Sequence, residues 1–181
     1  FNETKEALEQ QTGTSEILNV ISSSPTDVQP VFDAITSTAV RLCESTYGVV
    51  HRFDGTNIEL PIAMCNVTDE QMALYRRIFP LAASMDNALG ESALTRRTVQ
   101  IEDTQAERRY TLDTEAVRVA REVLGYRTVL MVPIVRRDQA LGIIAIWRRE
   151  QRLFSPGQIA LVETFADQDV TAIENVRLFK E

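Results

Sequence analysis

Residues 128–148, TVLMVPIVRRDQALGIIAIWR, carry the strongest structural signal in the chain. Two apolar segments, 128–136 and 140–148, flank a polar turn at 137–139, and this pattern predicts a β-hairpin. Both segments are apolar at successive positions, so each strand is expected to be buried on both faces, in the middle of a layered domain. Pro133 has no backbone N–H, and we expect a bulge or an unpaired position there.

The segments on either side of this hairpin predict the rest of the sheet and its covering helices. A second hairpin is expected where Asp54-Gly55 separates two strands. The remaining expected strands are 47–53, 58–64 and 99–103, and the expected helices are 3–23, 28–44, 68–79, 114–124 and 155 to the end, with a mixed pattern over 81–98. This order predicts an α+β domain with a central antiparallel sheet of five or six strands. The N- and C-terminal helices should pack on one face, and short helices and loops should form a cup on the other.

The two ends of the chain resemble each other. Phe179-Lys180-Glu181 aligns with Phe1-Asn2-Glu3, and both ends have the pattern of a polar helix with a sparse apolar seam. The match suggests one repeat of a longer array. We therefore expect a connecting helix over 1–24, a core over 25–157 and a closing helix over 158–181 that leads to the next module.

Composition argues against several functions. The net charge of -7 and the pI of about 4.9 disfavour nucleic acid, which needs a basic surface. Arginine pairs such as Arg148-Arg149 are interpreted as solvated ends of strands and helices. The longest apolar runs, 129–135 and 143–147, are far shorter than the ~20 residues of a membrane span, so no membrane contact is expected. Two cysteines make no disulfide framework, and a reducing, cytoplasmic setting is expected.

Several stretches resemble the GAF domains of bacterial multidomain sensor histidine kinases. They are SEILNVIS (15–22), PTDVQPVFDAI (25–35), RFDG (52–55), VLMVPI (129–134), LGIIA (141–145) and ENVRLF (174–179). The resemblance spans residues 15–178 and implies a PAS-like fold, with a cup over the sheet for a small ligand and terminal helices that dimerise. It also implies a covalently linked neighbour, which would be another sensor module, a histidine kinase core or a nucleotide cyclase.

The candidate ligand-binding residues come from the two hairpins and from the connection 103–113. They are His51, Cys65, Asp103, Arg109, Tyr110, Tyr126, Met131 and Trp147. Tyr110 and a neighbouring arginine could hold an anionic or aromatic ligand, and a solvated loop with ion pairs is the alternative. Tyr126, Met131 and Trp147 are expected either to line the cup from the sheet side or to form ordinary core.

No cofactor is indicated by the sequence. His51, the only histidine, is interpreted either as a haem ligand or pocket donor or as a packed strand residue with one hydrogen bond. Cys65 is followed by Asn66 and not by the histidine typical of bilin-binding GAF domains, so no bilin is expected. One histidine and two distant cysteines offer no metal-ligand spacing. Residues 165–169 match the motif of cyclic-nucleotide GAF domains only in part, so neither haem nor cyclic nucleotide is supported.

The closing helix carries apolar residues at roughly heptad spacing, which predicts a seam between two chains. The seam residues are Val162, Phe165, Asp169, Ile173 and Val176. Asp169 interrupts the seam and could keep two packings close in energy. The expected partner is therefore a second copy of the chain, joined through the terminal helices.

Three functions compete. The leading hypothesis is a regulatory sensory module of a histidine kinase, in which a ligand in the cup shifts the helices. The second is a ligand-free structural and dimerisation module: an open cavity with Arg109 and Tyr110 converging would favour the sensor, and a cup filled by its own side chains would favour this spacer. The third, a GAF-type reductase of free methionine sulfoxide, is disfavoured because the two cysteines match no such motif. No nucleophile elbow, phosphate loop or kinase motif supports catalysis by this domain.

Overall fold

The computed structural model describes the backbone of residues 2–24 and 26–180 and the side chains of residues 4–24 and 26–174. Its helices are α1 (Asn2–Ser23), α2 (Gln29–Leu42), α3 (Asp69–Arg76), α4 (Ala88–Thr95), α5 (Glu115–Leu124) and α6 (Pro156–Lys180). Its strands are β1 (Tyr47–Phe53), β2 (Asn57–Cys65), β3 (Leu81–Ala82), β4 (Val99–Ile101), β5 (Thr128–Arg136) and β6 (Gln139–Arg148). The similarity of the two ends rests on residues 1–3 and 179–181, whose side chains lie outside this description.

One antiparallel sheet, in the order β3-β2-β1-β6-β5-β4, forms the centre of the domain. Arg137 and Asp138 join β5 to β6 with φ angles of 50° and 64°, the left-handed conformation that a two-residue type I′ turn requires. The β5–β6 pairing shifts register between Ile134 and Val135, one residue beyond Pro133, where a bulge was expected. The structure confirms the predicted α+β domain with a six-stranded antiparallel sheet.

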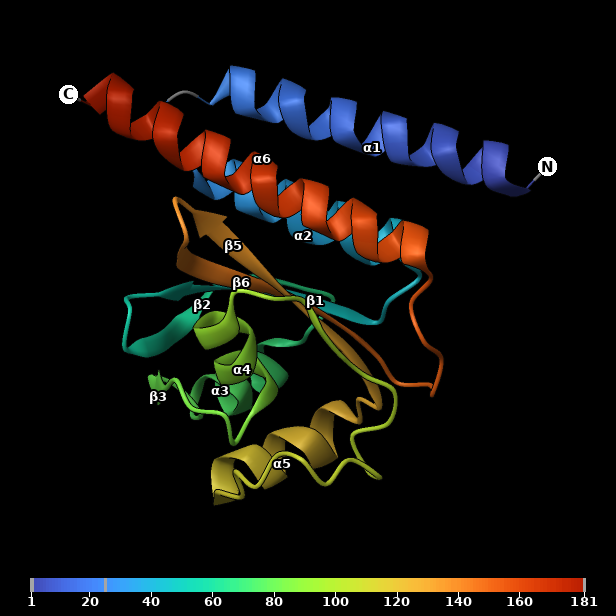
Figure 1. Cartoon of the computed structure of the whole chain (residues 1–181), viewed down its shortest axis with the longest axis vertical. Helices are drawn as coiled ribbons and strands as arrows, with labels where there is room; N and C mark the ends of the chain where they lie inside the picture. Colours follow the sequence, from blue (N-terminus) through green and yellow to red (C-terminus); the bar gives the residue numbers. More distant parts are fainter. Residues whose placement is uncertain (1, 25, 181) are drawn as a thin grey trace.

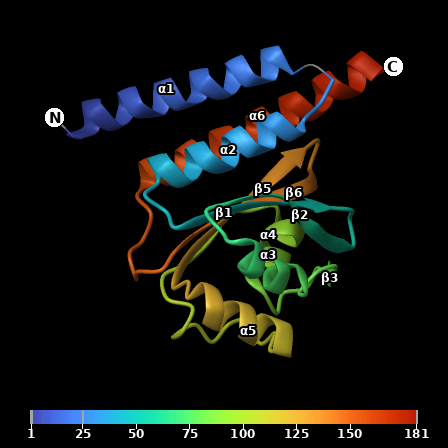
Figure 2. The same cartoon turned by 180° about the vertical axis from the view of Figure 1, so that it is seen from behind.

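Helices cover both faces of the sheet (Figures 1 and 2). α2 and α6 lie against one face, and the shorter helices α3, α4 and α5 lie on the other. α1 forms an additional layer, because it packs on α2 and α6 on the side away from the sheet. The two faces of the sheet therefore have separate cores, one under the long helices and one under the short helices.

Strand β6 shows why the central strands are apolar on both faces. Ile144 and Ile146 belong to the core under α2 and α6. Ile143, Ala145 and Trp147 belong to the core under α3, α4 and α5. All five side chains are at most 2% exposed, which confirms the predicted burial of this strand on both sides.

Two elements lie within residues 81–98, where the sequence pattern was mixed. β3 contributes only two residues to the sheet edge. α4 begins after Asn87, whose Oδ1 accepts a hydrogen bond from the Gly90 N–H at 2.7 Å. Gly90 has to be glycine, because a Cβ there would lie 2.0 Å from the backbone oxygen of Ser84. α4 packs on β5 and β6, on the face of the sheet opposite α6 (Figure 1).

α1 and α6 run in the same direction. Gln10 Nε2 donates to the carbonyl oxygen of Gly157 at 3.1 Å, near the start of α6. Further along both helices, Gln168 Nε2 donates to the carbonyl oxygen of Thr14 at 3.1 Å. Gly13 allows a close approach of α1 to α2, because a Cβ there would lie 2.6 Å from Cδ1 of Leu42. These contacts hold α1 on the outer side of the α2–α6 pair.

The seam predicted on α6 faces the interior of the same chain. Val162, Phe165 and Asp169 are all 0% exposed. Val162 and Phe165 share one core with residues of α1, α2 and the sheet, and Ile173 packs at the edge of that core. The side chain of Val176 lies outside the described residues. Val162, Phe165 and Asp169 therefore have no surface to offer a second chain in this fold, because the third helical layer covers the heptad stripe.

Candidate ligand-binding site

A cavity of about 530 Å³ lies between the sheet and the short helices. Val129, Met131 and Trp147 form its wall on the sheet side, and the connection 104–113 and helix α5 contribute to the opposite side. Its volume falls within the range of about 300–1,000 Å³ that is typical of small-molecule sites. The cup expected from the sequence is therefore a cavity with room for a ligand.

Four aromatic side chains line this cavity as a connected group, called here the aromatic wall: Tyr75, Phe79, Tyr126 and Trp147. Tyr126 stacks on Trp147 at 5.3 Å between ring centroids with planes 29° apart. Tyr75 meets Trp147 edge-on at 5.2 Å and Phe79 edge-on at 5.0 Å. Aromatic pairs at such separations favour these offset and edge-to-face arrangements. The wall offers flat apolar surface to any ligand that enters.

His51 supports the aromatic wall from behind and does not line the cavity. Its Nδ1 lies 2.8 Å from the carbonyl oxygen of Glu59, so this nitrogen carries the proton and donates. Its Nε2 then accepts from the Tyr75 hydroxyl at 2.6 Å. Complete burial lowers the pKa of His51 to about 4, so the ring is neutral near pH 7. His51 is thus a satisfied core histidine with two hydrogen bonds that orients a wall residue.

The connection 103–113 turns only part of its polar surface toward the cavity. Asp103 is engaged by Arg127, with Nε–Oδ1 at 3.1 Å and Nη2–Oδ2 at 2.6 Å, and does not line the cavity. Arg109 also lies outside the lining, since it pairs with Glu107 at 3.1 Å and covers the outer ring face of Tyr110 at 5.0 Å. Tyr110 itself does line the cavity, so the predicted convergence of Arg109 and Tyr110 on a ligand is not what the structure shows.

The two thiols lie away from the cavity lining. Cys65, at the end of β2, is partly buried, and burial raises the pKa of its thiol. Cys43 follows α2, and burial raises the pKa of this thiol to about 12, which disfavours the reactive thiolate. No group of three or more His, Cys, Asp or Glu side chains within residues 4–24 and 26–174 is arranged to hold a metal ion.

Of the eight predicted ligand-binding residues, the cavity brings together Tyr110, Tyr126, Met131 and Trp147. The sequence interpretation missed Arg121, which enters the lining from α5. The sequence does contain a signal for it, because positions 117, 121 and 124 share one face of α5. Val117 and Leu124, on either side of Arg121 along this face, are buried. A charged residue on the buried face of an amphipathic helix is a useful indicator of a site.

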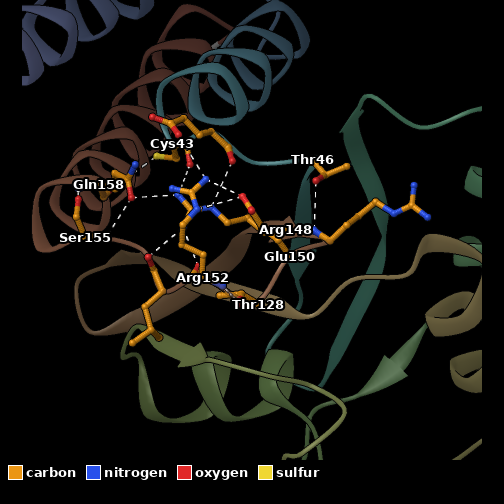
Figure 3. Close-up of polar contacts among 11 residues, drawn as sticks. Cys43, Thr46, Thr128, Arg148, Glu150, Arg152, Ser155 and Gln158 are labelled. Atoms are coloured by element: carbon orange, nitrogen blue, oxygen red, sulfur yellow. Dashed lines mark hydrogen bonds and ion pairs between the residues drawn. The ribbon is translucent and has the colours of Figure 1, made fainter.

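Arg148 lies next to Trp147 on β6 and points to the opposite face of the sheet. Its guanidinium is 1% exposed and forms the centre of the polar contacts in Figure 3. All five acceptors are neutral: the backbone oxygens of Cys43, Glu44, Arg152 and Leu153, and Oε1 of Gln158, at 2.6 to 3.3 Å. The interpretation of Arg148 as a solvated strand end was wrong, because these carbonyl groups converge on it at the end of the strand.

The Arg148 contacts fasten the start of α6 to the sheet. Gln158 also accepts from the backbone N–H of Ser155 at 2.9 Å, and Ser155 Oγ accepts from the N–H of Gln158 at 3.1 Å, forming a capping box at the first turn of α6. Figure 3 shows this cap beside the guanidinium. Consecutive residues of β6 thus reach the cavity on one face and the beginning of α6 on the other.

Comparison with known proteins identifies the class of this domain. The family model described as a GAF domain matches residues 25–174, which is most of the chain. The chain belongs to the GAF family. No curated protein matched the chain in a search of known sequences.

Solved structures show the same fold at low sequence identity. The GAF domain of a phosphoenolpyruvate-protein phosphotransferase from Coxiella burnetii is 15% identical, with 96% of this chain and 98% of that chain covered and a TM-score of 0.73. Free methionine-R-sulfoxide reductase from Neisseria meningitidis is 12% identical, with coverages of 97% and 93% and a TM-score of 0.71. A domain assigned to a two-component sensor histidine kinase from Sinorhizobium meliloti 1021 is 14% identical, with coverages of 83% and 93% and a TM-score of 0.63.

Within the described residues, every helix is too short or too polar to cross a membrane.

Proposed function

We propose that this domain is a sensory module of a signalling protein, which binds a small ligand in the cavity and passes the signal on through α6. One observation carries the proposal: Trp147 lines the cavity while the next residue, Arg148, holds the start of α6. A ligand that displaces the Trp147 ring would shift β6 locally and change the geometry of the Arg148 contacts. The signal requires that the ligand binds two arrangements of α6 with different affinity.

A histidine kinase is the proposed context, and a nucleotide cyclase is the alternative output. Support comes from GAF family membership and from the fold shared with the Sinorhizobium meliloti domain assigned to a sensor histidine kinase. The proposed setting is cytoplasmic, since Cys43 and Cys65 are both free thiols. In this scheme the domain regulates and an attached domain performs the chemistry.

The cavity favours a sensor over a ligand-free spacer. A spacer would fill the cup with its own side chains, whereas Met131, Tyr126 and Trp147 stand as walls around about 530 Å³. A reductase of free methionine sulfoxide is not favoured, because neither Cys43 nor Cys65 is part of the cavity lining. The GAF fold shared with the Neisseria meningitidis reductase therefore does not extend to a cysteine-lined site here.

Pairing of two chains through the terminal helices remains part of the proposal, with a different contact surface from the α6 seam. α1 exposes Leu8 and Leu18, with 63% and 51% of their surface accessible. The proposed contact is this exposed part of α1. Leu18→Glu should convert a dimer into a monomer in sedimentation equilibrium, and an unmodified chain that is monomeric at high concentration would remove this part of the proposal.

The test of the sensor proposal uses Trp147, the only tryptophan of the chain, as the reporter. A library of cytoplasmic metabolites is screened for changes in its fluorescence, together with native mass spectrometry of protein purified without added ligand. Each ligand found is then added during hydrogen exchange of the backbone. We expect altered exchange in the first turns of α6. A ligand that binds without any effect on α6 would refute the transmission route, and the absence of any ligand would favour the spacer.

A further inference from the structure

We propose that the cavity binds a small aromatic carboxylic acid, with its ring against Trp147 and Tyr126 and its carboxylate on Arg121; this inference rests on the proposed function. Three features of the lining lead to this class of ligand. They are the aromatic wall, two buried N–H donors that have no acceptor within the described residues, and the guanidinium of Arg121, which joins none of the ion pairs formed there.

The aromatic wall selects for a flat apolar group. Tyr126 and Trp147 lie nearly parallel, with their planes 29° apart, and Tyr75 presents its edge to the same indole. A ligand ring can add to this group by stacking or edge contact, each worth about 0.5–1.5 kcal/mol beyond simple burial. Val129 and Met131 extend the apolar surface along β5. The volume of about 530 Å³ accommodates one or two rings with a short side chain.

Two donors in the lining lack a partner within the described part of the chain. The indole Nε1 of Trp147, a residue only 2% exposed, is buried without an acceptor, and so is Nε of Arg121. Buried polar groups are almost always hydrogen-bonded, so unpaired donors in a cavity wall indicate where an acceptor belongs. The guanidinium of Arg121 also lies near the Tyr126 hydroxyl, where it partly offsets the rise in the pKa of Tyr126 caused by burial. Both residues belong to the same cavity lining, so these donors favour a ligand that carries oxygen acceptors.

Arg121 brings a positive charge into the lining of the cavity. None of the ion pairs formed within residues 4–24 and 26–174 includes Arg121. Of the acids in the lining, Glu107 pairs with Arg109 and Asp113 pairs with Arg118 at 3.3 Å. The third, Asp86, accepts a hydrogen bond from Asn87 Nδ2 at 2.8 Å.

Arg108 also lines the cavity, but its Nη1 donates to the backbone oxygens of Gln105 and Glu107 at 3.1 and 3.2 Å. The guanidinium of Arg121 suits a singly charged carboxylate, whereas a phosphate group, with a charge near -2, would be repelled more strongly by the acids of the lining.

The test compares three probes that separate the ring from the charge. Phenylacetate has both, phenylacetamide has the ring without the charge, and hexanoate has the charge without the ring. Binding is followed by Trp147 fluorescence and by calorimetry. We expect phenylacetate to bind at least about tenfold more tightly than phenylacetamide, because hydrogen bonds to a charged group contribute about 1.5–3 kcal/mol. It should bind about twofold to tenfold more tightly than hexanoate, because contact of a ring with the aromatic wall contributes about 0.5–1.5 kcal/mol.

Arg121→Met removes the charge and keeps the apolar stem, and Arg76→Met on α3 is the matched control, because Arg76 is exposed, absent from the lining and in no ion pair of the described residues. Arg121→Met should weaken phenylacetate about tenfold to a hundredfold and change phenylacetamide far less, whereas Arg76→Met should change neither. Arg121→Lys, which keeps the charge, should recover part of the affinity and serves as the second variant if Arg121→Met does not fold.

Each other outcome overturns a defined part of the reasoning. Equal binding of phenylacetate and phenylacetamide, or an unchanged Kd in Arg121→Met, would refute the carboxylate assignment while leaving a ligand-binding cavity in place. Hexanoate binding as tightly as phenylacetate would refute the role of the aromatic wall. Failure of all three probes would refute the aromatic acid, and the proposed function itself would fall only if the metabolite screen were also negative.

Discussion

His51 should make the stability of this domain sensitive to mild acid. Its ring is completely buried, donates to the Glu59 carbonyl and accepts from the Tyr75 hydroxyl. A proton on Nε2 would require the Tyr75 hydroxyl to turn from donor to acceptor and would put a charge in the core. Burial accordingly lowers the pKa of His51 from 6.5 to about 4. The matched perturbation is His51→Gln, because a carboxamide can donate to Glu59 and accept from Tyr75 but does not titrate.

The size and sign of the effect follow from this shift. Between pH 6.5 and pH 4 the unfolded chain binds a proton at position 51 that the folded chain rejects, so the free energy of unfolding falls as the pH falls. Relative to His51→Gln, the unmodified protein should lose about 1.5 kcal/mol at pH 5.5 and about 2.5 kcal/mol at pH 4.5. Above about pH 7.5 the His51 ring is neutral in both the folded and the unfolded chain. The difference in the free energy of unfolding between the unmodified protein and His51→Gln should then no longer change with pH.

Urea unfolding of both proteins, followed by circular dichroism at pH 7.5, 6.5, 5.5 and 4.5, measures this difference directly. Subtracting the two curves removes the contributions of all groups that titrate alike in both proteins. A difference that stays flat from pH 7.5 to 4.5 would show that His51 titrates normally. That result would contradict the neutral, doubly hydrogen-bonded ring, and with it the orientation of the Tyr75 hydroxyl.

Three further predictions concern stability. Arg148→Met should lower the free energy of unfolding by about 3–5 kcal/mol, because four backbone carbonyls, largely shielded from water, lose their donor, and a loss below about 1 kcal/mol in urea unfolding would contradict the role given to the guanidinium. Asp169 is buried, and neither of its oxygens has a hydrogen-bond partner among the described residues. Burial raises its pKa, so its contribution should destabilise the domain as the pH rises from about 4 toward neutrality. Asp169→Leu should therefore raise the thermal midpoint at pH 7.5 and flatten this dependence, and an unchanged midpoint would argue that the carboxylate has found a partner. Gly142→Ala should cost about 2 kcal/mol or more, since the added Cβ would lie 2.3 Å from the His51 carbonyl oxygen; equal stability by calorimetry would show that β1 and β6 can separate there.

The apolar strands and their turns were predictable because their signals are local. The pattern over residues 128–148 determines a buried hairpin before any tertiary contact is known, and α5 ends as expected at Gly125, with its φ of 65°. α4 was not predictable, because it depends on the contact of Gly90 with the backbone of Ser84, and no helical apolar period reveals it. Whether a segment such as α4 becomes a helix is decided by its contacts with other elements.

The candidate site divides in the same way. Trp147 and Met131 could be predicted as wall residues from the alternation of the central strands. Arg121 could have been predicted too, from its place on the buried face of α5. The direction of Arg109 could not, because it depends on how its loop packs over the sheet. Arg148 shows the same limit: its sequence context is that of a strand end, and only the convergence of α2, β6 and α6 buries it. The predicted seam on α6 failed for a related reason, since a heptad stripe does not say whether the covering helix belongs to another chain or to the same one.

The parallel course of α1 and α6 has a mechanical consequence. α1 starts at the end of the helical layer from which α6 also starts, so the beginning of α1 and the end of α6 lie at opposite ends of that layer (Figures 1 and 2). Tension applied between these two points pulls the helices past each other in shear. The contacts of Gln10 and Gln168 would then bear the load together instead of opening one after another. The overlap of α1 with its neighbours can be up to about 33 Å long, the length of its 22 residues. Under force, α1 should therefore resist detachment better than its sparse apolar contacts alone would suggest.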